Sequence, residues 1–371
     1  MSDRVLITGG AGFIGSHLAD ALLRDGYHVR ALDSLVQQVH PTRERPDYLD
    51  PAVELVVGDV RDADAVRSAL DDVDFVVHLA ARVGVGQSMY EIDDYVAVNS
   101  LGTATLLQAL LDRPVARIVV ASSMSIYGEG LYLDRGGRAV PALARTRAAL
   151  AERQWEPRGA EGEPLRPVPT PESKPPSLSS MYALNKFEQE RSVLLFGEAY
   201  GIPATALRFF NVYGPRQALS NPYTGVLAIF ASRLLNDKPP MIFEDGGQRR
   251  DFVAVSDVAN ACCLALEQPG VAGKVLNIGS GESVTVAEIA DRLARILGRP
   301  QLEAELTGEY RVGDIRHCFA DVSRAHTVLG YAPQVTLEDG MRELAIWLEG
   351  QVADDQVEQA RRELSQRGLT V

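Results

Sequence analysis

The chain has 371 residues, of which 46% are hydrophobic and 23% are charged, and its formal net charge is −13. This length predicts one large domain with a smaller one. The negative charge argues against nucleic acid or an anionic membrane as a partner, because both repel an acidic surface. No apolar run approaches the roughly 20 residues of a membrane span, and the N-terminus lacks a signal-segment pattern. We therefore expect a soluble, cytoplasmic protein.

Short β-branched runs alternate with helical periodicity through the first half of the chain. The expected strands are Val5–Thr8, Val29–Asp33, Val53–Val57, Phe75–Leu79, Ile118–Ser122 and Ala204–Phe209. The expected helices include Ile14–Arg24, Ala63–Leu70 and Ala97–Leu111. Strands separated by helices imply right-handed crossovers. The sequence therefore predicts an α/β fold, a doubly wound parallel sheet of the Rossmann type with a smaller α/β substrate domain.

The composition changes along the chain and predicts the domain organisation. Residues 1–210 are expected to form the Rossmann domain, with a long insertion at 131–178 that contains eight prolines and a short helix around Ala142–Arg153. Such an insertion is either a lid or docking element or a solvated loop. Residues 211–350, with short strands such as Met241–Phe243 and Val275–Ile278, are expected to form the smaller domain, interleaved with the first.

The final residues, 351–371, are expected to form a helical tail that lies on the surface or contacts another subunit. An apolar stripe marks one face of this helix, at Ala353, Val357, Ala360 and Leu364. The cysteines, Cys262, Cys263 and Cys318, have no metal-type spacing. They predict reduced thiols that pack as small apolar side chains, and no metal site.

A glycine-rich segment, Gly9-Gly10-Ala11-Gly12-Phe13-Ile14-Gly15, lies between the first strand and the first helix. This spacing lets the backbone turn tightly and bring amides against a pyrophosphate at the helix N-terminus. Asp33 ends the next strand, where a carboxylate accepts a hydrogen bond from the adenosine ribose and repels a 2′-phosphate. The combination predicts NAD, rather than NADP, as the cofactor.

Tyr182 and Lys186 are four residues apart in a helical segment and therefore share one helix face. A lysine cation beside a tyrosine favours the phenolate and lowers the tyrosine pKa, which makes the phenol a usable base. This spacing is common by chance. It gains weight here because Ser122 and Ser123 end the fifth expected strand.

Together these motifs resemble the extended short-chain dehydrogenase/reductase family, in particular its nucleotide-sugar epimerases and dehydratases, over roughly residues 4–345. Three further segments match motifs of this family, at Gly58–Val60, His78–Ala81 and Asn99–Thr103. The resemblance implies that NAD is bound by Gly9, Gly12, Phe13, Ile14, Gly15, Asp33, Asp59, Val60, Leu79, Ala80, Ala81, Asn99, Tyr182 and Lys186. His78 is expected to be a packed core histidine.

The resemblance also implies the catalytic and substrate-binding residues. Ser123, four residues before Tyr127-Gly128, would hydrogen-bond the reacting sugar hydroxyl, and Tyr182 with Lys186 would remove its proton. Asn211, Arg250 and Arg311 lie in segments (208–216, 248–253 and 311–314) that contact the substrate diphosphate in the family. Arginine suits this role because its planar fork pairs with phosphate oxygens. Asp251 and Asp257 are expected to stabilise the fold.

The absence of carboxylate residues directly after Ser123 reduces the number of reactions that this chain could catalyse. Family 4,6-dehydratases carry an Asp-Glu pair directly after the serine, and UDP-glucuronate decarboxylases tend to carry the glutamate. Met124 and Ser125 stand at these positions here. The sequence thus predicts NAD-dependent 4-epimerisation of a nucleotide-diphosphate sugar through a 4-keto intermediate, and leaves the base and the sugar open. The alternatives are a dehydratase, a 4-keto reductase, a decarboxylase, or a non-enzymatic NAD-binding module, which the intact catalytic set disfavours.

The resemblance implies a homodimer as well. The helices around Asp94–Leu111 and Tyr182–Phe196 resemble those that form a four-helix contact between subunits in this family.

Overall fold

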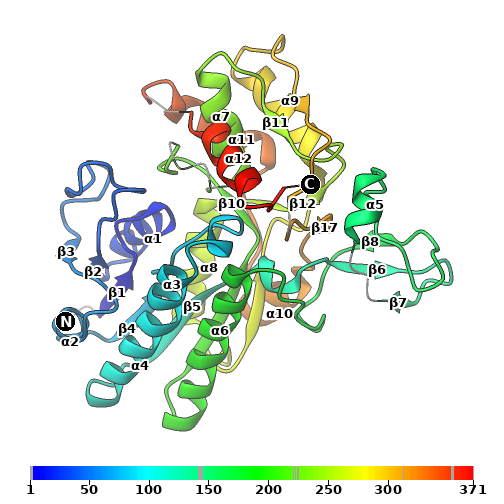
Figure 1. Ribbon diagram of the computed structural model, residues 1–371. Helices are drawn as coiled ribbons and strands as arrows, with labels where there is room; N and C mark the ends of the chain where they lie inside the picture. Colours follow the sequence, from blue (N-terminus) through cyan, green and yellow to red (C-terminus); the bar gives the residue numbers. More distant parts are fainter. Residues whose placement is uncertain are drawn as a thin grey trace.

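The computed structural model describes residues 3–140, 145–219, 221, 223, 225–311, 313–351 and 355–370. Its centre is a seven-stranded parallel sheet in the order β14-β9-β5-β4-β1-β2-β3 (Figure 1). The strands are β1 (Arg4–Thr8), β2 (His28–Asp33), β3 (Glu54–Val57), β4 (Phe75–His78), β5 (Arg117–Ser123), β9 (Ala204–Phe209) and β14 (Val275–Ile278). The strand order reverses between β1 and β4, so a ligand crevice is expected at the carboxyl ends of these strands. The predicted fold class is confirmed.

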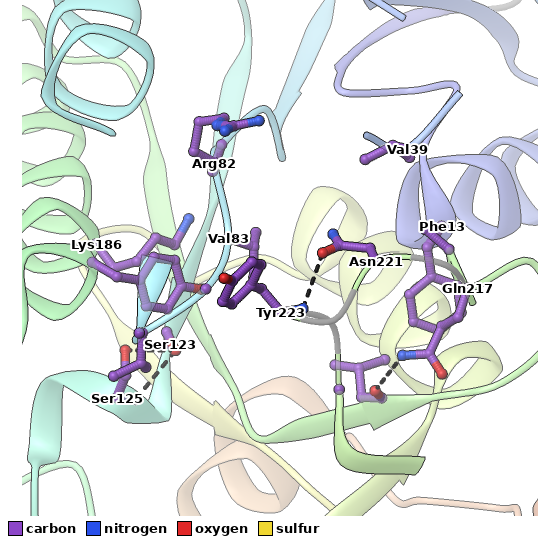
Figure 2. Close-up of a pocket in the computed structure, with 18 of the residues that line it drawn as sticks. Phe13, Val39, Arg82, Val83, Ser123, Ser125, Lys186, Gln217, Asn221 and Tyr223 are labelled. Atoms are coloured by element: carbon purple, nitrogen blue, oxygen red, sulfur yellow. Dashed lines mark hydrogen bonds between the residues drawn. The ribbon is translucent and has the colours of Figure 1, made fainter. Parts of the chain in front are cut away.

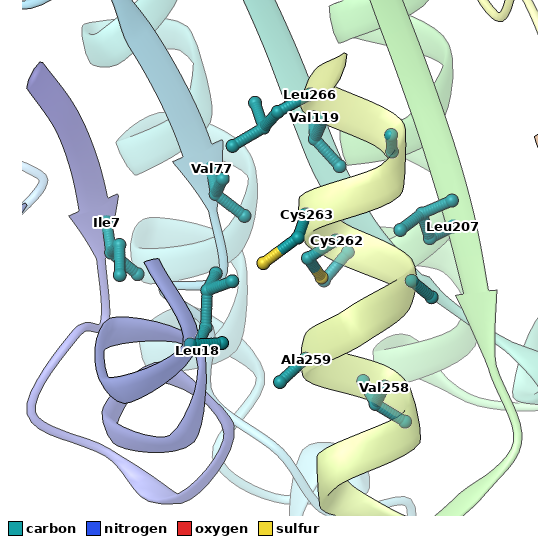
Figure 3. Packing of buried hydrophobic residues seen from close by; sticks show 14 of the residues in the cluster. Ile7, Leu18, Val77, Val119, Leu207, Val258, Ala259, Cys262, Cys263 and Leu266 are labelled. Carbon is teal, nitrogen blue, oxygen red and sulfur yellow. The ribbon is translucent and has the colours of Figure 1, made fainter. Parts of the chain in front are cut away.

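Helices cover both faces of this sheet. On one face lie α1 (Phe13–Arg24), α8 (Val255–Glu267) and α10 (Ser323–Leu329), and on the other lie α2 (Ala63–Ala69), α4 (Gly102–Asp112) and α6 (Met181–Tyr200). Figure 3 shows Cys262 and Cys263 of α8 packed toward the sheet beside Leu18 of α1. Both cysteines, and Cys318, are buried and free, as predicted. Burial on both faces explains why the strands are continuously apolar.

The strands expected in the first half of the sequence all occur, with ends shifted by no more than one residue. The helix expected at Ala97–Leu111 is different in detail. It follows α3 (Ile92–Tyr95) and opens with a π-helical segment, η2 (Val96–Leu101), before continuing as α4. Hydrophobic spacing detects that a helix is present, but it does not distinguish these hydrogen-bonding patterns.

A smaller domain lies above the carboxyl edge of the sheet (Figure 1). Its apolar core lies between α7 (Val226–Leu235), α9 (Val286–Ile296) and α11 (Leu337–Leu348). Its short strands pair as β10 (Asn211–Tyr213) with β13 (Phe252–Ala254), β11 (Met241–Ile242) with β16 (Glu305–Leu306), and β12 (Arg249–Arg250) with β15 (Val284–Thr285) and β17 (His317–Cys318). Between β13 and β15 the chain returns to the main sheet to form α8 and β14. The two layers therefore exchange segments.

The insertion at 131–178 projects to one side of the molecule (Figure 1). It contains β6 (Leu131–Leu133), β7 (Ala139–Val140), α5 (Arg147–Ala151) and β8 (Arg166–Val168). The described helix is shorter than the expected one, and residues 142–144 of that expectation lie outside the described residues. Two ion pairs dock the insertion on the smaller domain, Arg145 to Glu244 at 2.6 Å and Glu156 to Arg316 at 2.6 Å.

The tail forms α12 (Val357–Gln366), as the apolar stripe predicted. Ala360 and Leu364 of this stripe are buried against the rest of the chain, and Ala353 lies outside the described residues. In the described part of the chain, no helix has the length and apolar character needed to cross a membrane. The same residues contain no cluster of three or more side chains that could hold a metal ion.

A buried ion pair ties α6 to the sheet. Arg208 of β9 donates from Nε and Nη2 to the two carboxylate oxygens of Glu190, at 2.9 and 2.7 Å. Ser122 of β5 donates its hydroxyl to the same carboxylate at 2.6 Å. Glu190 and Arg208 are only 1% and 5% exposed. Because an unpaired buried charge is strongly unfavourable, these contacts fix α6 on β5 and β9.

Replacing Glu190 by alanine should therefore lower the free energy of unfolding by about 3–5 kcal/mol, because it leaves the Arg208 charge buried without a partner. Urea denaturation followed by circular dichroism measures this change. Glu198→Ala, at an exposed position on the same helix, is the matched control and should change the value by no more than about 0.5 kcal/mol. Equal effects of the two substitutions would show that the buried pair does not hold α6.

Candidate functional site

A cavity of about 650 Å³ runs from the glycine-rich loop, past the carboxyl ends of the central strands, to the smaller domain. Figure 2 shows Lys186, Ser123 and Ser125 on one side of it and Phe13 and Gln217 on the other. It brings together nearly all residues that the sequence singled out. These are Gly9, Gly12, Phe13, Ile14, Gly15, Asp33, Asp59, Val60, Leu79, Ala80, Ala81, Ser123, Tyr182, Lys186, Asn211, Arg250 and Arg311.

The glycine-rich loop approaches the cavity with its backbone. Gly9 has a φ of 73°, a conformation that side chains disfavour, and a Cβ atom at Gly15 would lie 2.3 Å from the Gly9 carbonyl oxygen. Glycine is therefore required for the loop to pack against the start of α1. No side chain caps the N-terminus of α1 at Gly12. Its free amides and the helix dipole form a site suited to a phosphate group.

Acidic side chains border this end of the cavity. The Asp33 carboxylate accepts hydrogen bonds from the backbone amides of Ala11, at 3.0 Å, and Leu35, at 2.9 Å. The Asp59 carboxylate binds the Arg61 guanidinium at 2.7 Å, and this hydrogen bond lowers the pKa of Asp59. The carboxylate at the end of β2 is thus held in place by the glycine loop itself.

Asn99 is the predicted cofactor residue that does not line the cavity. It is fully buried. Its Oδ1 accepts from the Arg82 backbone amide at 2.7 Å, and its Nδ2 donates to the Arg82 carbonyl at 3.1 Å. Asn99 therefore supports the backbone that follows Ala80 and Ala81, and acts on the cavity through that segment.

Three reactive side chains meet at the centre of the cavity. Tyr182 and Lys186 lie in the first two turns of α6. This helix begins at Met181 and is capped by Ser180, whose hydroxyl accepts a hydrogen bond from the Ala183 amide at 3.1 Å. Ser123, at the end of β5, hydrogen-bonds the Tyr182 phenol. It also accepts a hydrogen bond from the Ser125 hydroxyl at 2.9 Å. The sequence-predicted trio is brought together.

The ionisation of this trio differs from the expectation. Burial raises the pKa of Tyr182 to about 12, and the hydrogen bond with Ser123 opposes the shift only partly. Burial also lowers the pKa of Lys186 to about 7. The predicted lowering of the tyrosine pKa by the lysine is therefore wrong for the protein alone, because the cost of burying either charge is larger.

A chain of hydrogen bonds that sequence reasoning missed holds Lys186. Its Nζ donates to Gln189 Oε1 at 2.9 Å, and Gln189 Nε2 donates to the Thr103 hydroxyl at 2.9 Å. His78 lies 2.9 Å from the same hydroxyl, and burial lowers the pKa of this histidine to about 3. His78 is thus a neutral core residue, as expected. Gln189 and Glu190 follow Lys186 by three and four residues, so helical spacing alone could have predicted that they lie on the same face as the lysine.

The other end of the cavity carries the predicted substrate residues. The buried Oδ1 atom of Asn211 has no hydrogen-bond partner among the described residues. Arg250 donates to the carbonyls of Ile315 and of Arg316, the latter at 3.0 Å. Arg311 is paired with Asp314 at 2.9 Å, and its guanidinium lies 4.5 Å from the centre of the Phe243 ring. Val312 lies outside the described residues. Two guanidinium groups and an unsatisfied amide suit a polar, anionic ligand.

Asp251 and Asp257 stabilise the fold, as expected. Asp251 is fully buried and accepts hydrogen bonds from the amides of Ser280, Gly281 and Ala320. Asp257 accepts from the amides of Gln334 and Val335 at 2.9 and 3.1 Å.

Comparison with known proteins identifies similar chains along most of the sequence. The model of the NAD dependent epimerase/dehydratase family matches residues 5–149 and 155–279. A dTDP-L-rhamnose 4-epimerase of Burkholderia thailandensis is 37% identical over 350 residues, which cover 93% of this chain and 94% of that protein. A Thermus thermophilus UDP-glucose 4-epimerase in complex with NAD has 31% identity and a TM-score of 0.75, covering 94% of this chain and 100% of that one. A Thermotoga maritima UDP-glucose 4-epimerase with UDP-glucose has 29% identity and a TM-score of 0.76, covering 93% and 98%.

The lowered pKa of Lys186 can be tested directly, because the chain contains only four lysines (Lys174, Lys186, Lys238 and Lys274). In protein freed of ligand and labelled at lysine Cε, one NMR resonance should titrate with a pKa of about 7 and lose its positive charge as the pH rises. That resonance should be absent in Lys186→Met. If the resonance lost in Lys186→Met instead titrates near the ordinary lysine pKa, Lys186 is not desolvated in the way the structure indicates.

Proposed function

The chain belongs to the NAD-dependent epimerase/dehydratase family, and we propose that it inverts C4 of a nucleoside-diphosphate sugar through a transient 4-keto sugar. The observation that carries this proposal is one continuous cavity. Ser123, Tyr182 and Lys186 lie in it between a phosphate-binding glycine loop and a pair of arginines. The similar proteins include 4-epimerases of dTDP- or UDP-linked sugars, and a dehydratase and a decarboxylase of the same family are similar as well. The proposed substrate therefore carries a pyrimidine nucleoside diphosphate.

NAD is the cofactor, and the residues at the glycine-loop end fit it. The amides at the start of α1 would bind its pyrophosphate, and Asp33 would bind the adenosine ribose and repel the extra phosphate of NADP. Bound NAD supplies the hydride acceptor for C4 and a positive charge close to the phenol. This is the charge that Tyr182 lacks in the protein alone, where burial raises its pKa to about 12.

The residues at the centre of the cavity handle the proton. Ser123 would hydrogen-bond the sugar 4-hydroxyl, and Tyr182 would accept its proton and later return it. Lys186, whose Nζ donates to Gln189 at 2.9 Å, would bind the nicotinamide ribose. The diphosphate would be held by Asn211, Arg250 and Arg311. The 4-keto sugar could then rotate in the cavity while the nucleoside diphosphate stays bound.

The acidic groups of the cavity support epimerisation over dehydration. Met124 and Ser125, in η3 (Met124–Tyr127), line the cavity next to Ser123, and neither can act as a carboxylate acid or base. Among the described residues, the carboxylates that line the cavity are Asp33, Asp59, Asp94 and Asp314. Each of them already binds backbone amides or an arginine. None is left as a free acid beside Ser123.

We also propose a domain division into 1–210, 211–350 (interleaved with the first) and the tail 351–371, a cytoplasmic location and a homodimer. The dimer is supported by large apolar side chains exposed on adjacent helices. They are Ile92 of α3, Val96 and Leu101 of η2, and Leu184 and Leu195 of α6. Burying such a patch between two copies of the chain would remove it from water.

The reaction is tested with a panel of UDP- and dTDP-linked sugars in D₂O. The true substrate should give a C4-inverted product of unchanged mass, without deuterium at C5, and a C4-deuterated substrate should keep its label. A product lighter by one water, or deuterium at C5, would identify a dehydratase. Net consumption of NAD(P)H would identify a keto reductase, and release of carbon dioxide a decarboxylase. If the protein contains bound NAD but converts none of the sugars, it would be a non-enzymatic NAD-binding module.

Tyr182→Phe should lower kcat by roughly 10²–10⁴-fold, because it removes the proton acceptor. The NAD content and the Kd of the nucleotide sugar should stay near their normal values, since little contact surface is lost. Tyr200→Phe makes the same chemical change at an exposed position of α6, and should leave the rate unchanged. A near-normal rate for Tyr182→Phe would place the base elsewhere.

A further inference from the structure

The C-terminal helix α12 forms a wall of the cavity. The whole described part of its apolar stripe, Val357, Ala360 and Leu364, lines the cavity, together with Arg361 on the same helix and Leu369 beyond it. The Arg361 guanidinium lies 3.9 Å from the Met241 sulfur of β11. The lining at this end is otherwise mostly apolar and comes from α7 and β11, through Val226, Ile229, Phe230, Met241 and Ile242.

This end of the cavity lies beyond the residues proposed to bind the diphosphate. Thr370, after α12, forms a backbone bridge with Arg311. The catalytic trio lines the same cavity. In a nucleotide sugar the diphosphate separates the sugar from the nucleoside. With the sugar at Ser123 and the diphosphate at Arg250 and Arg311, the nucleoside would extend past Arg311, whose backbone pairs with Thr370 after α12.

Ion pairs hold α12 on the smaller domain. Arg361 donates to the Glu309 carboxylate at 2.9 Å. Asp355, just before the helix, is paired with Lys238 at 2.8 Å and lies 3.6 Å from Arg233. These contacts fix the side of the helix that faces α7 and β11.

A second set of contacts joins α12 to the loop that follows β4. The hydroxyls of Tyr90 and Tyr223 share a hydrogen bond of 2.5 Å, and each lies 3.3 Å from the Glu363 carboxylate, which accepts from the pair. The Arg367 guanidinium covers the Tyr90 ring at 4.3 Å. Leu364 packs so closely on this loop that a Cβ atom at Gly86 would lie 3.3 Å from it. The helix therefore spans the cavity from one domain to the other.

The contribution of α12 to the protein core is small, since Ala360 and Leu364 are its only buried side chains in the described range. The polar side chains around the helix are used to hold it in place, and its apolar stripe faces the cavity. A helix held in this way can pack its apolar face partly on the rest of the chain and partly on a ligand in the cavity.

We propose that α12 is part of the nucleoside subsite, with Val357, Ala360 and Leu364 packing on the base and ribose of a pyrimidine nucleoside diphosphate. The inference rests on the proposed function and extends it, because it makes the tail a determinant of which nucleotide is accepted. The contacts of Glu363 with Tyr90 and Tyr223 close the helix over the bound nucleoside.

The experiment compares three variants of the full holoenzyme by isothermal titration with dTDP and with UDP. Leu364→Ala should weaken the better-bound nucleotide about fivefold or more, because it removes apolar contact with the ligand. A chain ending at Gly350 should weaken it about tenfold or more. Leu348→Ala is the control, because this α11 leucine is also buried, at 1% exposure, and does not line the described cavity. It should lower thermal stability and leave both Kd values unchanged.

The NAD released on denaturation should be the same for all variants, and in turnover assays KM should rise with kcat near normal. Unchanged nucleotide Kd values for Leu364→Ala and for the shortened chain would overturn the inference and leave the proposed function intact. An equal loss of affinity in Leu348→Ala would also overturn it, since the effect would then be general destabilisation. Failure of the unaltered protein to bind either nucleotide would contradict the proposed function and the inference together.

Discussion

The buried carboxylate of Glu190 sets the geometry of the centre of the cavity. It receives both donors of the Arg208 fork and the Ser122 hydroxyl, so one group joins α6 to β5 and β9. Tyr182, Lys186 and Glu190 follow one another at intervals of four residues and share a helix face. Fixing the third of them therefore fixes the direction in which the first two point. Ser122 precedes Ser123, so the same carboxylate also sets the serine against which Tyr182 hydrogen-bonds.

The same burial determines the charge state at the centre of the cavity. Arg208 is paired with the buried Glu190 carboxylate at 2.7 Å, so the two charges compensate each other below the centre of the cavity. Burial raises the pKa of Tyr182 to about 12 and lowers that of Lys186 to about 7, so the protein favours the neutral form of the phenol and weakens the lysine charge. A bound cofactor that brings positive charge changes this balance. Under the proposed function, proton transfer at Tyr182 would therefore depend on a molecule bound at the glycine-loop end.

The sequence predicted those structural features that depend on a local pattern of residues. The strands, α1 and the glycine loop follow from short runs of residues, and the family motifs located the reactive trio. What it could not predict depends on contacts between distant segments. The Asn99 motif was recognised, but not that its amide turns inward to Arg82. The stripe of α12 predicted a helix, but its position over the cavity depends on partners such as Tyr90 and Glu309. The expected tyrosine pKa was wrong because sequence spacing contains no measure of burial.

The two ends of the cavity are built differently, and this has a consequence for how substrate choice could change. The cofactor end is backbone and a helix N-terminus, fixed by the central sheet. The other end is formed by side chains from short strands and from the helices α7 and α12. Arg250 is held by the carbonyls of Ile315 and Arg316, and Arg316 is itself bound by Glu244 and by Glu156 of the insertion. None of the described residues of the insertion lines the cavity, yet the insertion supports the segment that orients Arg250. Substitutions in the insertion can therefore alter the segment that holds Arg250 while the central sheet and the glycine loop keep their geometry.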